Sequence, residues 1–170
     1  MTAFILNASF SFAASFVAAL VLHELGHFVA ARLCNVPIKQ AGFGWGPKLF
    51  GVRVSDVDYQ LRALPVGAYI QMDMVALQTR PLLQQLFVLG AGVGVNLVLC
   101  VLTWGTVFST LNLALAIGNI VPFYQLDGWK SGMVILRRIF GGPSPLVEWV
   151  LTLGGGAIAL AVFIRAFQNF

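Results

Sequence analysis

The first apolar stretch of the chain, from Phe4 to Leu33, carries a metal-binding pattern in its second half. About 20 apolar residues suffice for a helix to cross a bilayer, so this stretch is long enough. Within it lies His23-Glu24-Leu25-Gly26-His27, which contains the only two histidines of the chain. On a helix the two imidazoles lie one turn apart on one face, and Glu24 lies near enough to act on a water held there. The segment therefore predicts a zinc site inside a membrane helix.

Composition supports a membrane setting for the whole chain. Hydrophobic residues make up 59% of it and charged residues only 9%, whereas soluble domains average about a quarter charged. A length of 170 residues allows one domain of about four transmembrane helices and one substantial loop. We expect an all-α membrane protein in which residues 1–170 form a single polytopic domain. The first stretch is too long for a signal-peptide core, so we expect it to be retained as a membrane helix.

Apolar stretches and the residues that interrupt them divide the chain into four predicted spans. These cover about 4–33, 82–108, 111–140 and 146–167. The third span is interrupted by Pro122 and Asp127-Gly128, which predicts a broken helix, and a short link near 109–112 precedes it. Gly90-Ala91-Gly92-Val93-Gly94, inside the second span, indicates close helix packing and not a phosphate loop.

The long connection over residues 34–80 has the pattern of short strands. Residues 57–63 and 66–73 alternate between apolar and polar side chains, and Leu64-Pro65 separates them. Glycines between positions 42 and 51 indicate tight turns or a hairpin. We expect a membrane-associated β-hairpin or small sheet between the first two spans. An extended substrate could join its edge as an extra strand, or the sheet could be a plain structural cap.

The basic residues predict the orientation in the membrane. Most of them lie in or beside the 34–80 loop or lead into the turn at 141–145, and only Arg165 falls on the other side. By the positive-inside rule this loop and this turn face the cytoplasm and both termini lie outside. We expect a multi-pass protein of a bacterial inner membrane.

The net charge of +4 does not indicate a nucleic-acid partner, because the chain has no basic run with interleaved aromatic residues. The expected partners are the lipid bilayer and a transmembrane protein or peptide substrate. A membrane-protein partner or a homo-oligomer stays open.

A catalytic zinc ion takes three protein ligands, so the two histidines need a third partner. Besides Glu24, Asp127 is the one acidic residue within an apolar span, where ionisable side chains are costly and usually functional. Cys100 is a weaker candidate, and Cys34 and Cys100 otherwise indicate free thiols. Two alternatives stay open: Asp127 could cap the helix that follows it, and the histidines could pair between helices.

The predicted chemistry is hydrolysis of a peptide bond by water that one Zn²⁺ per chain activates. Glu24 is the predicted general base, which takes the proton of the water and delivers it to the leaving amine. Asn96 and Asn119 are polar residues in apolar spans. They could donate hydrogen bonds to the oxyanion or the substrate backbone, or they could join helices.

These motifs resemble those of the site-2 protease family of intramembrane zinc metalloproteases, over roughly residues 16–140. The HExxH pattern is one match, and Asn119 to Gly128 reproduces the family's Asn-x-x-Pro-x-x-x-Leu-Asp-Gly in full. The resemblance implies that Asp127 is the third zinc ligand. Gly44-Trp45-Gly46-Pro47 and residues 64–70 are similar to the turn and strand of the family's membrane-associated β-hairpin, which the family uses to handle substrate.

Two departures from the family pattern limit what the resemblance implies. Residues 91–96 are similar to the family's Gly-Pro-x-x-Asn segment, but Val93 stands in place of its proline. Many relatives insert a PDZ domain between the second and third core helices, and the link near 109–112 is too short for one. We therefore expect a minimal core without that regulatory domain.

The sequence as a whole predicts a zinc-dependent intramembrane endopeptidase. It would cut a transmembrane segment or a signal-peptide remnant near the cytoplasmic side, after local unwinding of the substrate helix. The alternative is a non-proteolytic membrane subunit that binds or escorts a partner in a larger complex, and the intact Glu24, histidines and Asp127 argue against it. A metal transporter would show further metal-binding residues along a path, and the sequence has none.

Overall fold

The computed structural model describes residues 2–142 and 145–168. The elements follow one another as α1 (Thr2–Leu33), β1 (Ile38–Val54), β2 (Val57–Met72), α2 (Met74–Gln78), α3 (Leu82–Leu102), α4 (Val107–Ile120), α5 (Asp127–Ile139) and α6 (Pro145–Gln168). The two chain ends and residues 143–144 of the predicted turn at 141–145 lie outside the described residues. Most of the described chain is helical, and its one small sheet is the pair β1–β2.

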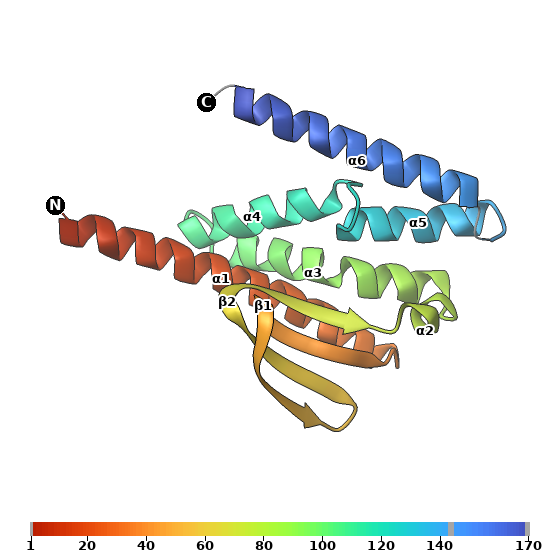
Figure 1. Ribbon diagram of the computed structural model, residues 1–170, viewed down its shortest axis with the longest axis horizontal. Coiled ribbons are helices and arrows are strands. Elements are labelled where there is room, and N and C mark those ends of the chain that lie inside the picture. The colour runs from red at the N-terminus through yellow and green to blue at the C-terminus, as the bar shows by residue number, and fades with distance from the viewer. Residues whose placement is uncertain (1, 143–144, 169–170) are drawn as a thin grey trace.

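Helix α3 lies at the centre of the helical part. It packs against α1 on one side and against α4 and α5 on the other, while the hairpin lies beside the second half of α1 (Figure 1). Helices α1 and α3 run in opposite directions, and α4 and α5 follow each other nearly end to end along α3. Side chains from α1 and from the start of α5 can therefore meet beside α3.

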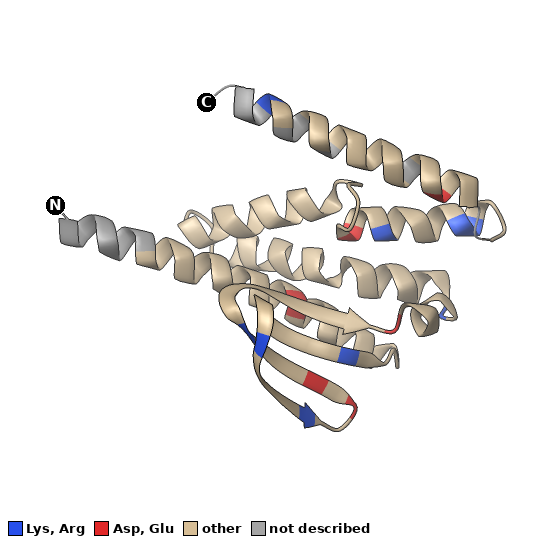
Figure 2. Ribbon diagram, viewed as in Figure 1, with Lys and Arg blue, Asp and Glu red and all other residues tan. Residues whose placement is uncertain are grey.

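Within residues 2–142 and 145–168, two helices are long and apolar enough to cross a membrane. They are Phe10–Leu33 within α1 and Leu82–Leu102, with mean hydropathies of 1.6 and 2.2. Two further apolar helical segments, Val107–Ile120 and Pro145–Ile158, are shorter. Most of the charged residues lie on the hairpin or near helix ends (Figure 2), as expected where helices face lipid. The count of four spans stays a prediction.

The turn between α3 and α4 comes earlier than the sequence predicts. The second span was expected to continue to position 108, but α3 ends at Leu102. Gly105 adopts a left-handed φ of 82°, and the Thr106 hydroxyl accepts a hydrogen bond from the Ser109 amide as the N-cap of α4. The predicted link at 109–112 is thus the first turn of α4.

The break between α4 and α5 has a local cause. Pro122 has no N–H and cannot continue a helix, so α4 ends at Ile120. A short loop follows in which Gln125 adopts a left-handed φ of 76°, and α5 begins at Asp127. A Cβ on Gly128 would collide with the Ile120 carbonyl oxygen. Glycine therefore lets the start of α5 lie against the end of α4.

The hairpin differs from the predicted short strands. Its two strands are continuous and antiparallel, and Val54 pairs with Val57 across a two-residue turn that the sequence analysis did not find. The glycines expected in turns lie inside β1, where Gly44 and Gly46 have φ values of 95° and 87° and the register shifts. The strands bend strongly as a result.

The base of the hairpin is joined to the helices by a small apolar core. This core includes the fully buried side chains Val36, Ile38, Val57, Leu77, Val88 and Leu89. Asp73 caps α2 by accepting from the amides of Val75 and Ala76, and its contact with Lys39 holds the pKa of its carboxyl below the ordinary value. Cys34 and Cys100 are buried free thiols, as predicted.

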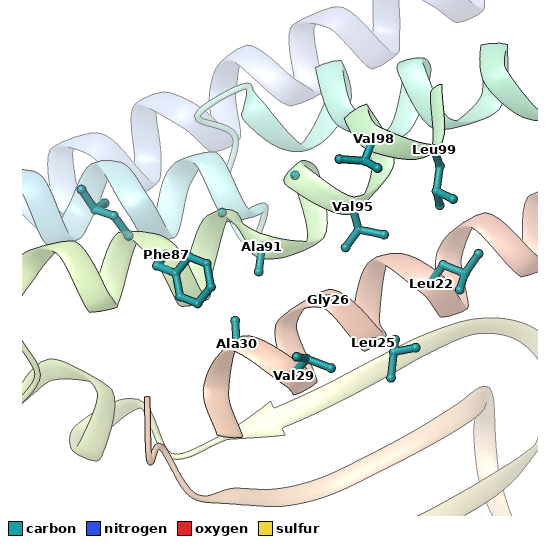
Figure 3. A pocket seen from close by; sticks show the side chains of 13 residues that line it. Leu22, Leu25, Gly26, Val29, Ala30, Phe87, Ala91, Val95, Val98 and Leu99 are labelled. Atoms are coloured by element: carbon teal, nitrogen blue, oxygen red, sulfur yellow. The ribbon is translucent and has the colours of Figure 1, made fainter. Parts of the chain in front are cut away.

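A second glycine sets the spacing of α1 and α3. A Cβ on Gly26 would lie 2.9 Å from the Ala91 carbonyl oxygen and 2.8 Å from Val95 Cγ2. Beside this contact the two helices border an apolar cavity of about 690 Å³ (Figure 3). Its lining contains no ionisable side chain, so the chemistry must lie elsewhere.

The glycine at the start of α5 gives a test of the fold. We expect Gly128→Ala to lower the melting temperature, because overpacking against a backbone carbonyl costs roughly 1–3 kcal/mol. Gly132→Ala lies in the same helix with nothing within 4 Å of the added Cβ. This control should leave the melting temperature equal or slightly higher. Equal melting temperatures for the two variants would contradict the close approach of α5 to α4.

Candidate metal centre

Three predicted ligands from two distant parts of the chain meet beside α3. His23 and His27 lie one turn apart on α1, and Asp127 is the first residue of α5. Asp127 Oδ2 lies 3.1 Å from His23 Nε2 and 3.0 Å from His27 Nε2, and the two Nε2 atoms are 3.2 Å apart. All three residues are buried. The structure therefore brings together the ligand set that the sequence predicted.

The other ring nitrogen of each histidine indicates which tautomer is present. His27 Nδ1 lies 2.8 Å from the Val88 carbonyl oxygen, and His23 Nδ1 lies 2.6 Å from Asn96 Oδ1. Both partner oxygens accept hydrogen bonds, so each Nδ1 donates. In the neutral form of each ring the lone pair is then on Nε2, which faces Asp127.

Three acceptor atoms that face one another without a donor repel each other, unless a cation lies between them. Zinc bound to histidine at about 2.0–2.1 Å in a tetrahedral site places neighbouring ligand atoms about 3.3 Å apart. The observed separations of 3.0–3.2 Å are close to that length. The donor set and its spacing thus fit a zinc ion.

The backbone of α3 leaves room at this point because residue 92 is a glycine. A Cβ built on Gly92 would collide with Nε2 of both His23 and His27. The sequence pattern predicts helix packing for this glycine and for its neighbours Gly90 and Gly94. Neither of those neighbours has an atom within 4 Å of an added Cβ. Nothing in the sequence indicates that Gly92, and not Gly90 or Gly94, lies against the histidines.

Asp127 is oriented by a lysine that the sequence analysis did not select. Lys130 lies one turn further along α5, and its Nζ is 3.3 Å from Asp127 Oδ1. The two carboxylate oxygens therefore have different partners, Oδ1 facing the ammonium and Oδ2 facing the imidazoles. The N-cap of α5 is Leu126. Because Lys130 follows Asp127 by three residues on a helix, this spacing could have predicted that the two side chains pair.

Glu24 lies half-buried on α1 and borders two cavities. One, of about 280 Å³, also has His27, Asp127, Lys130 and residues 69–72 of β2 in its lining. The other, of about 320 Å³, lies between α1 and the hairpin. The Glu24 side chain thus lies where the metal centre meets the space beside β2.

The two asparagines have different surroundings. Asn96 is fully buried and bonds to His23 through Oδ1. Asn119 donates from Nδ2 to the Leu115 carbonyl oxygen of its own helix, at 3.0 Å. Asn119 does not line the cavity beside Glu24. Cys100, the weaker ligand candidate, lies against Ser109 and outside the group formed by the histidines and Asp127.

Comparison with known proteins places this site in a family. Residues 11–111 match Peptidase family M50, the site-2 protease family, and this range includes the histidine motif and Asn96. The chain belongs to peptidase family M50. The M50 assignment confirms the resemblance seen in the sequence, and it makes the protein a member of a membrane metalloprotease family.

Three M50 relatives bear the name "putative zinc metalloprotease". The protein of Clostridium perfringens is 34% identical over 64% of this chain and 35% of its own length. That of Clostridium acetobutylicum is 33% identical over 69% of this chain and 38% of its own length. The Neisseria meningitidis protein is 30% identical over 83% of this chain and 36% of its own length. The chain thus spans a little over a third of these relatives.

The glycine beside the histidines gives a test of the metal centre. We expect Gly92→Ala to abolish zinc binding, because its methyl group would collide with the two ligand nitrogens. Gly94→Ala, two residues along the same helix with open space around the added Cβ, is the matched control and should keep wild-type zinc. Zinc per chain is measured by elemental analysis of the purified proteins, with melting temperatures in parallel. Full zinc loading of Gly92→Ala would contradict this placement of the ion.

Proposed function

We propose that this chain holds one catalytic zinc ion between His23, His27 and Asp127 and hydrolyses peptide bonds of membrane-embedded substrates. The observation that carries the proposal is the convergence of three buried lone pairs on one point, with Glu24 lining the same cavity. Bound there, Zn²⁺ would polarise the scissile carbonyl and lower the pKa of the attacking water.

Glu24 is the proposed general base. Its carboxylate follows His23 directly on α1 and shares a cavity with His27 and Asp127. A carboxylate in this place can take a proton from the attacking water and pass it to the leaving amine. Lys130 lines the same cavity. Its contact with Asp127 Oδ1 leaves Oδ2 available as the single ligand oxygen of that carboxylate.

The proposed substrate path runs between α1 and the hairpin. Glu24 borders both the cavity at the metal centre and the adjacent cavity lined by residues 41–43 and 68–70 of the two strands. A peptide bond is accessible to water only in an extended segment, because a membrane helix satisfies its own amides. We infer that a locally unwound transmembrane segment or signal-peptide remnant lies beside β2. The cut would fall in the cytoplasmic half of the membrane.

The decisive test of the proposed function is Glu24→Gln. We expect this variant to bind zinc as the wild type does but to cleave a model transmembrane substrate about 10²–10⁴-fold more slowly, because the general base is lost. Glu148→Gln makes the same change at a carboxylate that pairs with Arg137 away from the centre. This control should cleave at close to the wild-type rate.

The same assay separates the protease from a non-proteolytic subunit. A protease releases product with wild-type protein and Glu148→Gln, and not with Glu24→Gln. If wild-type protein binds zinc but releases no product from several substrates with helix-breaking residues, the proteolytic function is wrong. The chain would then act as a binding subunit.

A further inference from the structure

A buried chain of hydrogen bonds runs from α4 across α3 to the metal centre. Asn112 Nδ2 donates to the Phe108 carbonyl oxygen at 2.8 Å, and Asn96 Nδ2 donates to Asn112 Oδ1 at 3.0 Å. Asn96 Oδ1 in turn lies 2.6 Å from His23 Nδ1. Asn96 and Asn112 both have a relative exposure of 0%. Both amides are therefore shielded from bulk water.

The Phe108 carbonyl sets the direction of every bond in the chain. A backbone carbonyl only accepts, so the Asn112 amide must turn its NH₂ group towards Phe108 and its oxygen towards α3. That oxygen also only accepts, so Asn96 must present its NH₂ group to Asn112 and its oxygen to His23. An oxygen at 2.6 Å from Nδ1 requires a proton on Nδ1. In the neutral imidazole of His23 the lone pair then lies on Nε2, which faces Asp127.

We propose that Asn112 is a positioning residue that acts through Asn96 to hold His23 in the tautomer with its Nε2 lone pair towards the metal. The inference rests on the proposed zinc site and deepens it, because it gives Asn96 and Asn112 a defined task. Asn96 uses both ends of its amide within the chain. We therefore assign Asn96 to holding a ligand in place.

The alternative tautomer shows what the chain of amides prevents. With its proton on Nε2, His23 could donate to Asp127 Oδ2, which lies 3.1 Å away, and Nε2 would then have no lone pair for a metal. Asn96 would have to rotate its amide to donate to Nδ1, and its oxygen would then face Asn112 Oδ1. Two acceptors in contact in a dry site oppose that rotation.

The two histidines provide an internal comparison. His27 Nδ1 donates to the backbone carbonyl of Val88, so its tautomer does not depend on any asparagine. His23 depends on Asn96 and, through it, on Asn112. Because the chain has only two histidines, ¹⁵N-histidine labelling of the whole protein gives two imidazole spectra.

The experiment compares the wild type with Asn112→Leu and with a matched control, Ser109→Ala. Leucine branches at the same carbon as asparagine, although it is larger, and it cannot form a hydrogen bond with Asn96. Ser109 is also buried on α4 and donates to the Cys100 carbonyl oxygen of α3 at 2.8 Å, but it does not contact Asn96. Zinc affinity is measured by chelator competition, and the protonation of each Nδ1 by ¹⁵N NMR of metal-free protein. Melting temperatures are recorded for all three.

We expect Asn112→Leu to lower zinc affinity about 10- to 100-fold, the usual effect of losing the partner that orients a ligand. In metal-free Asn112→Leu the Nδ1 proton of His23 should be partly lost, while that of His27 is kept. Ser109→Ala should match the wild type in both measurements.

Three results would overturn the inference. One is a wild-type, metal-free protein whose His23 Nδ1 lacks a proton, which can be tested even if Asn112→Leu does not fold. Another is an equal change at both histidines, and the third is a loss of zinc affinity in Ser109→Ala as large as in Asn112→Leu. If the wild type binds no zinc, the proposed function fails, and the Nδ1 signals of the two histidines still decide the role of Asn112.

Discussion

The mutual repulsion of three buried lone pairs constrains the rest of this structure. Two imidazole nitrogens and one carboxylate oxygen within 3.2 Å of one another in a dry site need a proton or a metal cation between them, and they need partners that hold their other atoms. Helix α3 supplies most of that support although it contributes no ligand. It offers the Val88 carbonyl to one ring and Asn96 to the other, and Gly92 leaves the space between them open.

The break before α5 follows from the same constraint. Asp127 reaches the histidines of α1 from the first residue of a separate helix. Pro122 ends α4 before that point, and Gly128 lets α5 start against the end of α4. The hairpin completes the arrangement, because its apolar base packs on α1 and α3 and places residues 69–72 of β2 beside Glu24. Fold and site thus depend on a few close backbone contacts that only glycine permits.

Much of the site could be predicted from the sequence because charged and polar residues are so rare in the spans. Asp127 was selected because no other acidic residue apart from Glu24 lies within an apolar stretch, and the structure places it at the histidines. Asn112 was missed because the second span was expected to end at 108, which put Asn112 in a link. The space that Gly92 leaves for the histidines and the direction of the Asn96 amide both depend on contacts between helices. The spacing of residues along the chain does not predict such contacts.

The bond between His27 and the Val88 carbonyl has a consequence for how this site can vary in evolution. A backbone carbonyl is present whatever side chain occupies position 88, so no single substitution there deletes the acceptor. The acceptor of His23 is a side chain, Asn96, which a mutation at position 96 removes and a mutation at position 112 leaves free to rotate its amide. The two ligands of one motif therefore differ in mutational robustness. Random mutagenesis of α3 and α4 should damage the metal centre mainly through His23.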